Sequence, residues 1–374
     1  MAAIQPIMQI EFASNTSRYM PPLTGIRALA ALLVLVMHTE QNIPTGLYSI
    51  LPFFARGYLG VDFFFVLSGF IITYVYLSGL ANPNGASVLI FLWHRFIRLY
   101  PVHLTILAFL VGIVYVASVV GIVLNNPQDW QWKDLIWDLT LLQAWGVTAG
   151  VGWNAPSWSI SAEWFAYLLF PLLAPALIRV HERSTALLIA VAALVTLALV
   201  FAIADWTLNT WVGAPALSRV LGEFLCGAAL CRAVALGKEL PRSSGDILGT
   251  SAFFIFLLGA SVGLPDIALV ALLALTIFGA ATSSGYLAQL LGSGPLVWLG
   301  EISYSIYMMH FPILIMIRRL WERLGFAKWE IAGKTFAFLI TAVLIIALSA
   351  MMFYLVERRA RTRLRDQMGA FAPA

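Results

Sequence analysis

The chain has 374 residues, of which 61% are hydrophobic and 11% are charged, and its formal net charge is +4. A chain this apolar cannot hide its hydrophobic surface inside one soluble core, so the composition excludes a soluble globular protein and indicates a polytopic membrane protein. Much of the positive charge comes from the C-terminal stretch ERRARTRLR, which is typical of a membrane-surface anchor and not of a nucleic-acid-binding patch.

Apolar runs of about 20 residues, each long enough to span a bilayer, recur from residue 24 almost to the C-terminus. No stretch between them is polar enough to form a separate soluble domain. The predicted fold is therefore all-α, a single membrane domain over residues 1–374 with a core at about 20–357 and a bundle of about ten transmembrane helices. The expected spans are 24–41, 58–78, 99–124, 156–178, 184–204, 214–235, 246–263, 266–284, 296–317 and 331–356.

The charges of the loops predict an orientation. With both termini in the cytoplasm, most of the basic loop residues fall inside the cell, as the positive-inside tendency requires, and the basic loop 318–330 is the exception. Residues 133–145 are too short and too acidic for a span and predict an interfacial or re-entrant element. Cys226 and Cys231 are five residues apart, about 140° around a helix, which predicts neither a disulfide nor a metal pair.

The first span, TGIRALAALLVLVMHTE, carries Arg27 and His38. Eleven residues make three helical turns plus about 20°, so both side chains project from one face, roughly 16 Å apart along the axis. Ionisable groups inside a span are costly and usually face a cavity or one another. This face is therefore a candidate functional surface.

The second span begins within GYLGVDFFFVLSGF, with Asp62 near its start. The expected topology puts Asp62 level with His38, so its carboxylate is predicted to accept a hydrogen bond from one ring nitrogen and to fix the imidazole tautomer. The alternative is that Asp62 only caps the N-terminus of its own helix.

Arg95 and Arg98, in FLWHRFIRLYP, share a helical face at the expected inner membrane surface. Two guanidiniums there can bind a phosphate or a carboxylate. Two arginines taken alone are better explained as an ordinary positive-inside anchor. The residues around them must decide between an anchor and a binding site.

Glu163 lies about two turns into the span NAPSWSISAEWFAYLLFP, with Tyr167 one turn further on. A glutamate inside the membrane needs a partner or a proton, so it is expected to pair with a cation such as Arg27 or Arg219, or to bind a hydroxyl group. Arg219 and Glu223, four residues apart, are predicted to form an intrahelical ion pair.

The segment LGEISYSIYMMHFPIL, residues 299–314, contributes Tyr307 and His310, which share a helical face. A lone histidine in a span is more often a hydrogen-bonded bundle residue than a functional one. Ser157, Ser159 and Ser161 are expected to bond between helices and not to act as nucleophiles, since nothing local supplies a base.

Five motifs occur in a fixed order, TGIRALAALLVLVMH, GYLGVDFFFVLSGFIIT, RFIRLYP, WSISAEWFAYLLFP and LGEISYSIYMMHFPI. In this order they resemble membrane acyltransferase family 3, the bacterial integral-membrane O-acyltransferases that act on extracytoplasmic glycans and similar acceptors. The resemblance covers about residues 20–357. It implies a multi-pass protein of the bacterial cytoplasmic (inner) membrane, with acyl-CoA, most simply acetyl-CoA, as co-substrate and no metal.

The resemblance also implies roles for residues of this chain. Arg27 and His38 match the family's Arg and His pair, whose His is taken as the catalytic base. Arg95 and Arg98 match its Arg-x-x-Arg motif, which is associated with acyl-CoA binding. Asp62 falls where the family has an acidic residue before its Phe-rich run.

The fourth and fifth motifs add two further residues. Glu163 matches the Glu of the family's Trp-Ser-x-x-x-Glu, and His310 matches a frequent histidine of its Ser-Tyr-x-x-Tyr region. Two departures stand out, because Trp164 replaces a second acid and Glu357 is followed by Arg358 where many members have Glu-Pro. The first is expected to affect acceptor choice and the second only the tail. Many members also carry an SGNH hydrolase-like domain, which these 374 residues lack.

The expected mechanism combines these points. Acyl-CoA binds from the cytoplasm in a central cavity, and His38, oriented by Asp62, deprotonates the hydroxyl of an extracytoplasmic carbohydrate or similar acceptor. Glu163, Tyr167, Tyr307 and His310 are expected to organise the acceptor or the cavity. Direct transfer and a covalent acyl-His38 intermediate are both open.

Two other classes of function were weighed. A transporter or flippase of a lipid-linked sugar would use the same buried charges as a relay. A sensor or assembly subunit would keep the fold without the chemistry, but such a subunit would have no need of the arginine and histidine set.

Overall fold

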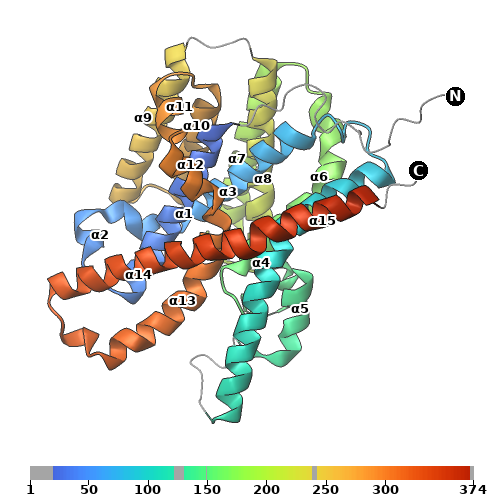
Figure 1. Cartoon of the computed structure of the whole chain (residues 1–374). Coiled ribbons are helices and arrows are strands. Elements are labelled where there is room, and N and C mark those ends of the chain that lie inside the picture. Colours follow the sequence, from blue (N-terminus) through green and yellow to red (C-terminus); the bar gives the residue numbers. More distant parts are fainter. Residues whose placement is uncertain (1–19, 122–129, 149, 238–241, 371–374) are drawn as a thin grey trace.

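The computed structural model describes residues 20–121, 130–148, 150–237 and 242–370. The described residues form helices joined by short loops and contain no β-strand. Figure 1 shows the helices packed into a bundle that α14 and α15 cross as one long rod. The helices are α1 (Pro21–Asn42), α2 (Leu47–Ile50), α3 (Leu59–Tyr76), α4 (Gly85–Val119), α5 (Leu135–Thr140), α6 (Ser157–Ile178), α7 (Arg183–Ile203), α8 (Ala214–Leu236), α9 (Arg242–Val262), α10 (Asp266–Thr282), α11 (Tyr286–Leu291), α12 (Gly294–Glu301), α13 (Ser303–Arg323), α14 (Ile331–Met352) and α15 (Arg358–Ala370).

Seven of the described helices are long and apolar enough to cross a membrane. The pair α12 and α13, bent by 62° at its break, would make an eighth. All ten expected spans overlap a described helix, but α10 has only 17 residues and α8 carries Arg219, Glu223 and Arg232. The all-α membrane class is confirmed, whereas the count of about ten spans is not.

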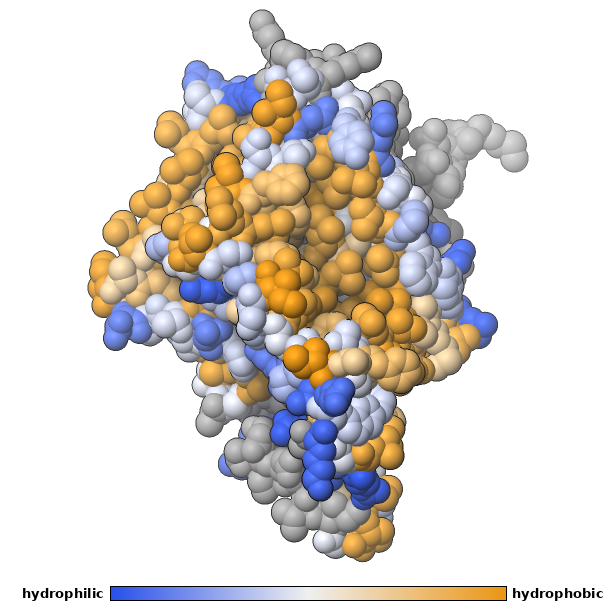
Figure 2. Space-filling model, turned by 90° about the vertical axis from the view of Figure 1, so that its left-hand side faces the viewer, coloured by the Kyte–Doolittle hydropathy of each residue, from blue (hydrophilic) through white to orange (hydrophobic). Residues whose placement is uncertain are grey.

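The outer helices expose large apolar side chains, such as Ile203 on α7, Phe254 on α9 and Val343 on α14. Figure 2 shows a broad hydrophobic surface on one side of the molecule, with hydrophilic residues gathered mainly toward its ends. An apolar surface of this extent suits lipid and would be unstable in water.

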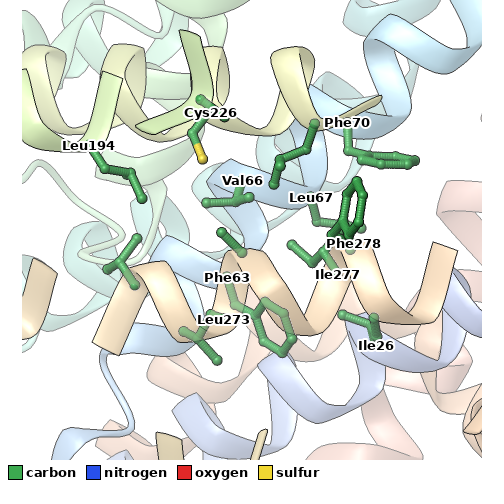
Figure 3. Close-up of a cluster of buried hydrophobic side chains, with 14 of the residues drawn as sticks. Ile26, Phe63, Val66, Leu67, Phe70, Leu194, Cys226, Leu273, Ile277 and Phe278 are labelled. Carbon is green, nitrogen blue, oxygen red and sulfur yellow. The ribbon is translucent and has the colours of Figure 1, made fainter. Parts of the chain in front are cut away.

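Helix α3 lies in the middle of the main hydrophobic cluster. Figure 3 shows Phe63, Val66 and Phe70 of this helix packed between side chains of α8 and α10. Cys226 of α8 belongs to the same cluster, and it and Cys231 are free thiols, as their spacing predicts.

Gly69 of α3 and Gly227 of α8 bring these two helices into backbone contact. A Cβ atom at Gly69 would lie 1.9 Å from the carbonyl oxygen of Phe224, and one at Gly227 would lie 1.8 Å from that of Val66. Small residues allow such close approach between membrane helices. The position of α3 against α8 is therefore fixed by these two glycines.

Helix α4 begins well before the expected span, because a capping box stabilises its N-terminus. The side-chain oxygen of Asn84 accepts from the Ser87 backbone N–H at 2.9 Å, and the Ser87 hydroxyl accepts from the Asn84 backbone N–H at 3.0 Å. The 35-residue helix therefore starts at Gly85 and includes Arg95 and Arg98, which were expected to share a helical face just before the span.

The segment expected to be interfacial or re-entrant forms α5 and two short 3₁₀ turns, none of them long enough to span a bilayer. The Asp138 carboxylate accepts from the Trp153 backbone N–H at 3.2 Å, and the Asp138 carbonyl accepts from Nε2 of His103 at 2.8 Å. Asn154, which follows Trp153 in the chain, donates to the carbonyl of Met308 at 3.4 Å. This bond ties the loop to α13. Burial raises the pKa of Asp138 to about 7.

Replacing Gly69 by alanine is expected to force α3 and α8 apart, since the added methyl would overlap the carbonyl of Phe224. The free energy of unfolding should fall by about 1–3 kcal/mol. The measurement is the thermal unfolding midpoint of the purified protein in detergent. Gly112→Ala in α4 is the matched control, because nothing lies within 4 Å of its Cβ position. Equal midpoints for the two variants would contradict the close packing.

The raised pKa of Asp138 predicts a stability that depends on pH. The protonated carboxyl stabilises the fold fully below its ordinary pKa of 3.8, and this contribution is lost as pH rises through about 7. Asn cannot ionise, so Asp138→Asn should unfold at the same temperature as the parent near pH 4 and at a higher temperature at pH 8. If the unfolding temperatures of parent and variant changed with pH in the same way, Asp138 would be ionised in the folded protein without a loss of stability.

Candidate functional site: an arginine-rich cavity beside a histidine pair

A cavity of about 470 Å³ lies inside the bundle between α1, α3, α4, α6 and α13. Its volume is within the range of small-molecule binding sites. Most of its wall is apolar. The ionisable residues that line it are Arg27, Arg95, Arg98 and Glu163, which give the wall a formal charge of +2 from three cations and one anion. Such a wall favours a polyanionic ligand.

Arg95 is held against aromatic rings on one side of the cavity. Its guanidinium donates to the hydroxyl of Tyr76 at 2.9 Å and lies 5.0 Å from the centre of that ring. It also lies 5.9 Å from the ring of Tyr167, whose hydroxyl is 3.1 Å from the Ser68 hydroxyl. Tyr167 is thus a wall residue, as predicted, and it helps to orient an arginine.

Arg98 is held by Glu357, an acid for which no contact was predicted. Glu357 accepts a hydrogen bond from the Arg98 guanidinium, and its other oxygen accepts from the Ser305 hydroxyl at 2.8 Å. The guanidinium also lies 5.0 Å from the centre of the Tyr304 ring. The sequence predicted a tail effect only for Arg358, which follows Glu357, and it predicted no contact between Glu357 and Arg98.

Arg27 and Glu163 enter the cavity from opposite helices, α1 and α6. Two cations were expected as partners of Glu163. Arg27 lines the same cavity as Glu163, whereas Arg219 pairs with Asp62. Both residues therefore lie in the predicted site.

His38 lies beyond the far end of this cavity and forms a pair with His310. Nδ1 of His38 is 3.0 Å from the carbonyl oxygen of Val34, and Nδ1 of His310 is 2.6 Å from that of Tyr307. A carbonyl can only accept, so each Nδ1 carries a proton, and in the neutral form each ring presents Nε2 as an acceptor. The two ring centres are 4.9 Å apart, and His310 Nε2, buried, has no hydrogen-bond partner among the described residues.

Two aromatic residues of the cavity lining contact each other, and one of them also contacts the histidine pair. Phe64 of α3 and Tyr307 of α13 line the end of the cavity with ring centres 6.1 Å apart, and the Tyr307 ring lies 5.7 Å from that of His310. The Ser159 hydroxyl donates to the Tyr307 hydroxyl at 2.8 Å, which holds the ring in place. We call Phe64 and Tyr307 the aromatic partition. In the described part of the chain, the cavity lining reaches Arg27 but not His38.

Asp62 does not contact His38, and that prediction is wrong. Both carboxylate oxygens of Asp62 accept from Arg219 of α8, at 2.7 and 2.6 Å, and both side chains are almost completely buried. Gly60 faces α1 close to the carbonyl of Ala30, so Asp62, about 200° further around the helix, points away from α1. This packing also puts Asp62 about two turns from the level of His38.

The ion pair expected between Arg219 and Glu223 is looser than the contact with Asp62, with a closest N to O distance of 3.9 Å. Arg219 also donates to the Leu208 carbonyl at 2.6 Å and lies 5.2 Å from the Trp158 ring. Of the serines of α6, Ser159 makes a bond between helices, to the hydroxyl of Tyr307 on α13 at 2.8 Å, whereas the Ser161 hydroxyl donates to the loop carbonyl of Leu141 at 2.7 Å.

The fold and the site define an integral membrane protein with a positively charged internal cavity next to two histidines. A family model described as an acyltransferase domain matches residues 22–354. The chain therefore belongs to this acyltransferase family, as the five motifs predict.

Individual relatives agree with this assignment. The chain is 30% identical over 362 residues to the acyltransferase MdmB of Streptomyces mycarofaciens, and the match covers 88% of each protein. It is 26% identical over 329 residues to the O-acetyltransferase OatA of Staphylococcus aureus and 27% identical over 331 residues to the peptidoglycan O-acetyltransferase OatA of Listeria monocytogenes. These two matches cover 80% of this chain but only 51% and 50% of the relatives. No solved structure matches the chain.

The buried pair of Asp62 and Arg219 predicts a stability defect and not a catalytic one. Arg219→Leu leaves a buried carboxylate without its cation and should cost about 3–5 kcal/mol of unfolding free energy. The double variant Asp62→Leu with Arg219→Leu removes both charges and should recover much of that loss, which thermal unfolding in detergent can measure. Strictly additive losses would show that the two residues are not coupled.

Proposed function

We propose that this protein transfers an acyl group, acetyl most readily, from cytoplasmic acyl-CoA to a hydroxyl of an extracytoplasmic glycan or lipid-linked saccharide. The observation that carries the proposal is the positively charged cavity that ends beside two histidines of fixed tautomer. A nucleotide-bearing thioester has phosphates for the arginines and an apolar arm for the rest of the wall.

The donor is assigned to the cavity by charge. Arg95 and Arg98 lie one turn apart on α4, and Arg27 faces them from α1. Forked guanidiniums suit phosphate oxygens, and their surplus charge inside an apolar bundle is costly unless a polyanion binds there. The thioester end of the donor then extends toward Ser159, Phe64 and Tyr307.

His38 acts as the general base in this proposal, without help from Asp62. The Val34 carbonyl keeps the proton on Nδ1, so Nε2 can take the proton of the acceptor hydroxyl. The hydroxyl oxygen bonds to the thioester carbonyl carbon, the carbon–sulfur bond breaks, and the departing thiolate takes the proton from His38. An acyl group held on Nε2 of His38 is the alternative route, and it would be trapped when donor is supplied without acceptor.

The aromatic partition must move for this reaction to occur. Tyr307 lines the cavity and contacts His310, while His38 is not part of the lining, so in this proposal the acyl carbonyl reaches His38 only when the ring of Tyr307 or of its neighbour Phe64 shifts. Tyr307 and His310 are then neighbours of the acceptor, while Glu163 and Tyr167 shape the cavity next to the donor.

The relatives support the acceptor class. Two of them are named O-acetyltransferases and one of these a peptidoglycan O-acetyltransferase, which supports a hydroxyl of a carbohydrate outside the cytoplasm. In this proposal the protein lies in the bacterial inner membrane with both termini in the cytoplasm, so that Arg95 and Arg98 face the side where acyl-CoA is made.

His38→Ala should reduce acyl transfer by about 10²–10⁴-fold, because it removes the general base. Arg98→Ala should instead mainly raise the KM for acyl-CoA. The measurement is release of free CoA and acylation of a saccharide acceptor by purified protein in detergent, where no gradient exists and a transporter would show no turnover. His181→Ala, at an exposed position, is the matched control. Wild-type turnover by the His38 variant would exclude the assignment.

A further inference from the structure

Glu357 is a buried acid at the end of the last long apolar helix. It is 1% exposed and closes a five-residue π-helical stretch, Phe353–Glu357, between α14 and α15. Short π-helical stretches inside α-helices are rare and are frequent at functional sites, because the extra residue in the turn re-aims the side chains. Glu357 also lies three residues beyond the region that the family model matches, residues 22–354.

The contacts of Glu357 connect three helices. One carboxylate oxygen accepts from Arg98 of α4 and lies 3.7 Å from Nη1 of Arg361, and the other accepts from the hydroxyl of Ser305 of α13 at 2.8 Å. Both oxygens are therefore engaged, so the carboxylate has a defined orientation. Arg361 is 46% exposed, whereas Arg98 is 14% exposed and lines the cavity.

The guanidinium of Arg98 is thereby held in one orientation. Glu357 holds its Nη1, and its central carbon lies 5.0 Å from the ring centre of Tyr304. The Tyr304 ring is itself fixed, because its hydroxyl donates to the Leu99 carbonyl at 2.6 Å. A guanidinium has five N–H donors, so fixing one edge leaves other donors for a ligand in the cavity.

We propose that Glu357 is a positioning residue for donor binding, which holds Arg98 so that its remaining N–H groups face the phosphates of the acyl-CoA. This inference rests on the proposed function. An arginine side chain that is already ordered loses less rotamer freedom when the ligand binds, and the gain appears as affinity for the donor. Glu357 acts through Arg98 and does not touch the reacting atoms.

The test compares a donor that has the nucleotide phosphates with one that lacks them. In Glu357→Ala, the KM for acetyl-CoA should rise about tenfold, as expected for loss of an ordered charge-assisted contact, with kcat changed by less than about threefold. The KM for acetyl-pantetheine, which lacks the nucleotide, should stay at the parent value. Glu357→Gln keeps a carbonyl oxygen for Arg98 and an amide for Ser305, so it should restore the acetyl-CoA KM to within about threefold of the parent.

Glu322→Ala is the matched control. Glu322 forms the same type of pair with Arg318, at 2.9 Å, but both side chains are 58% exposed and neither lines the cavity. Its KM values should equal those of the parent. Direct binding of CoA to the purified protein separates this inference from the proposed function, because weaker CoA binding by Glu357→Ala would support it even in the absence of acyl transfer.

Two results would overturn the role of Glu357. The first is an unchanged KM and CoA affinity in Glu357→Ala. The second is an equal rise for acetyl-CoA and acetyl-pantetheine, which would mean that Glu357 supports the cavity as a whole. If Glu357→Ala does not fold, Ser305→Ala tests the proposal instead. This change releases the second oxygen of Glu357, so the KM for acetyl-CoA, but not for acetyl-pantetheine, should rise by about two- to threefold. Parent values for Ser305→Ala would then reject the proposal.

Discussion

The buried ion pair between Asp62 and Arg219 is the interaction on which the rest of the bundle depends. It joins α3 to α8 inside the membrane domain, where an isolated charge would be very costly. Gly69 and Gly227 bring the two backbones close enough for this contact. With Asp62 turned toward α8, the opposite side of α3 is free to line the cavity with Phe64 and Ser68. One helix thus separates a structural charge pair from the functional cavity.

The rule that a buried charge is costly without a partner also applies to the other buried charges. Arg98 has Glu357, but the wall of the cavity as a whole has more cations than anions. A surplus of positive charge in an apolar bundle reduces stability when the cavity is empty. This surplus of positive charge is the physical reason to assign the cavity to a ligand with several negative charges.

The sequence predicted the class of fold and most residues of the site, because both depend on strong local signals. Apolar runs predict membrane helices, and Arg27, Arg95, Arg98 and Glu163 are costly residues in such helices. All four line one cavity. His38 was also predicted because it is an ionisable residue inside an apolar span, although it lies beyond the aromatic partition. The span count was less certain, since α10 is short and α8 is charged.

The errors concern information that is not local. Asp62 was paired with His38 from its expected depth in the membrane, but the packing of Gly60 on α1 sets the actual register and turns Asp62 toward Arg219. The contact between Glu357 and Arg98 joins residues that are 259 positions apart, so the local sequence around neither residue predicts it. The early start of α4 is an exception, because a local pattern could have predicted it. Asn84 and Ser87 have the spacing of a capping box.

The aromatic partition has a consequence for the movement of protons. The cavity is lined by three arginines and a glutamate, and the histidine pair lies next to Tyr307 of its lining, so a file of water joining them would be a route for protons. Phe64 and Tyr307 interrupt that path with apolar rings, and the Ser159 hydroxyl fixes one of them. Among the described residues the cavity lining therefore stops short of both histidines, and a file of water from the arginines to the histidines would have to pass these two rings.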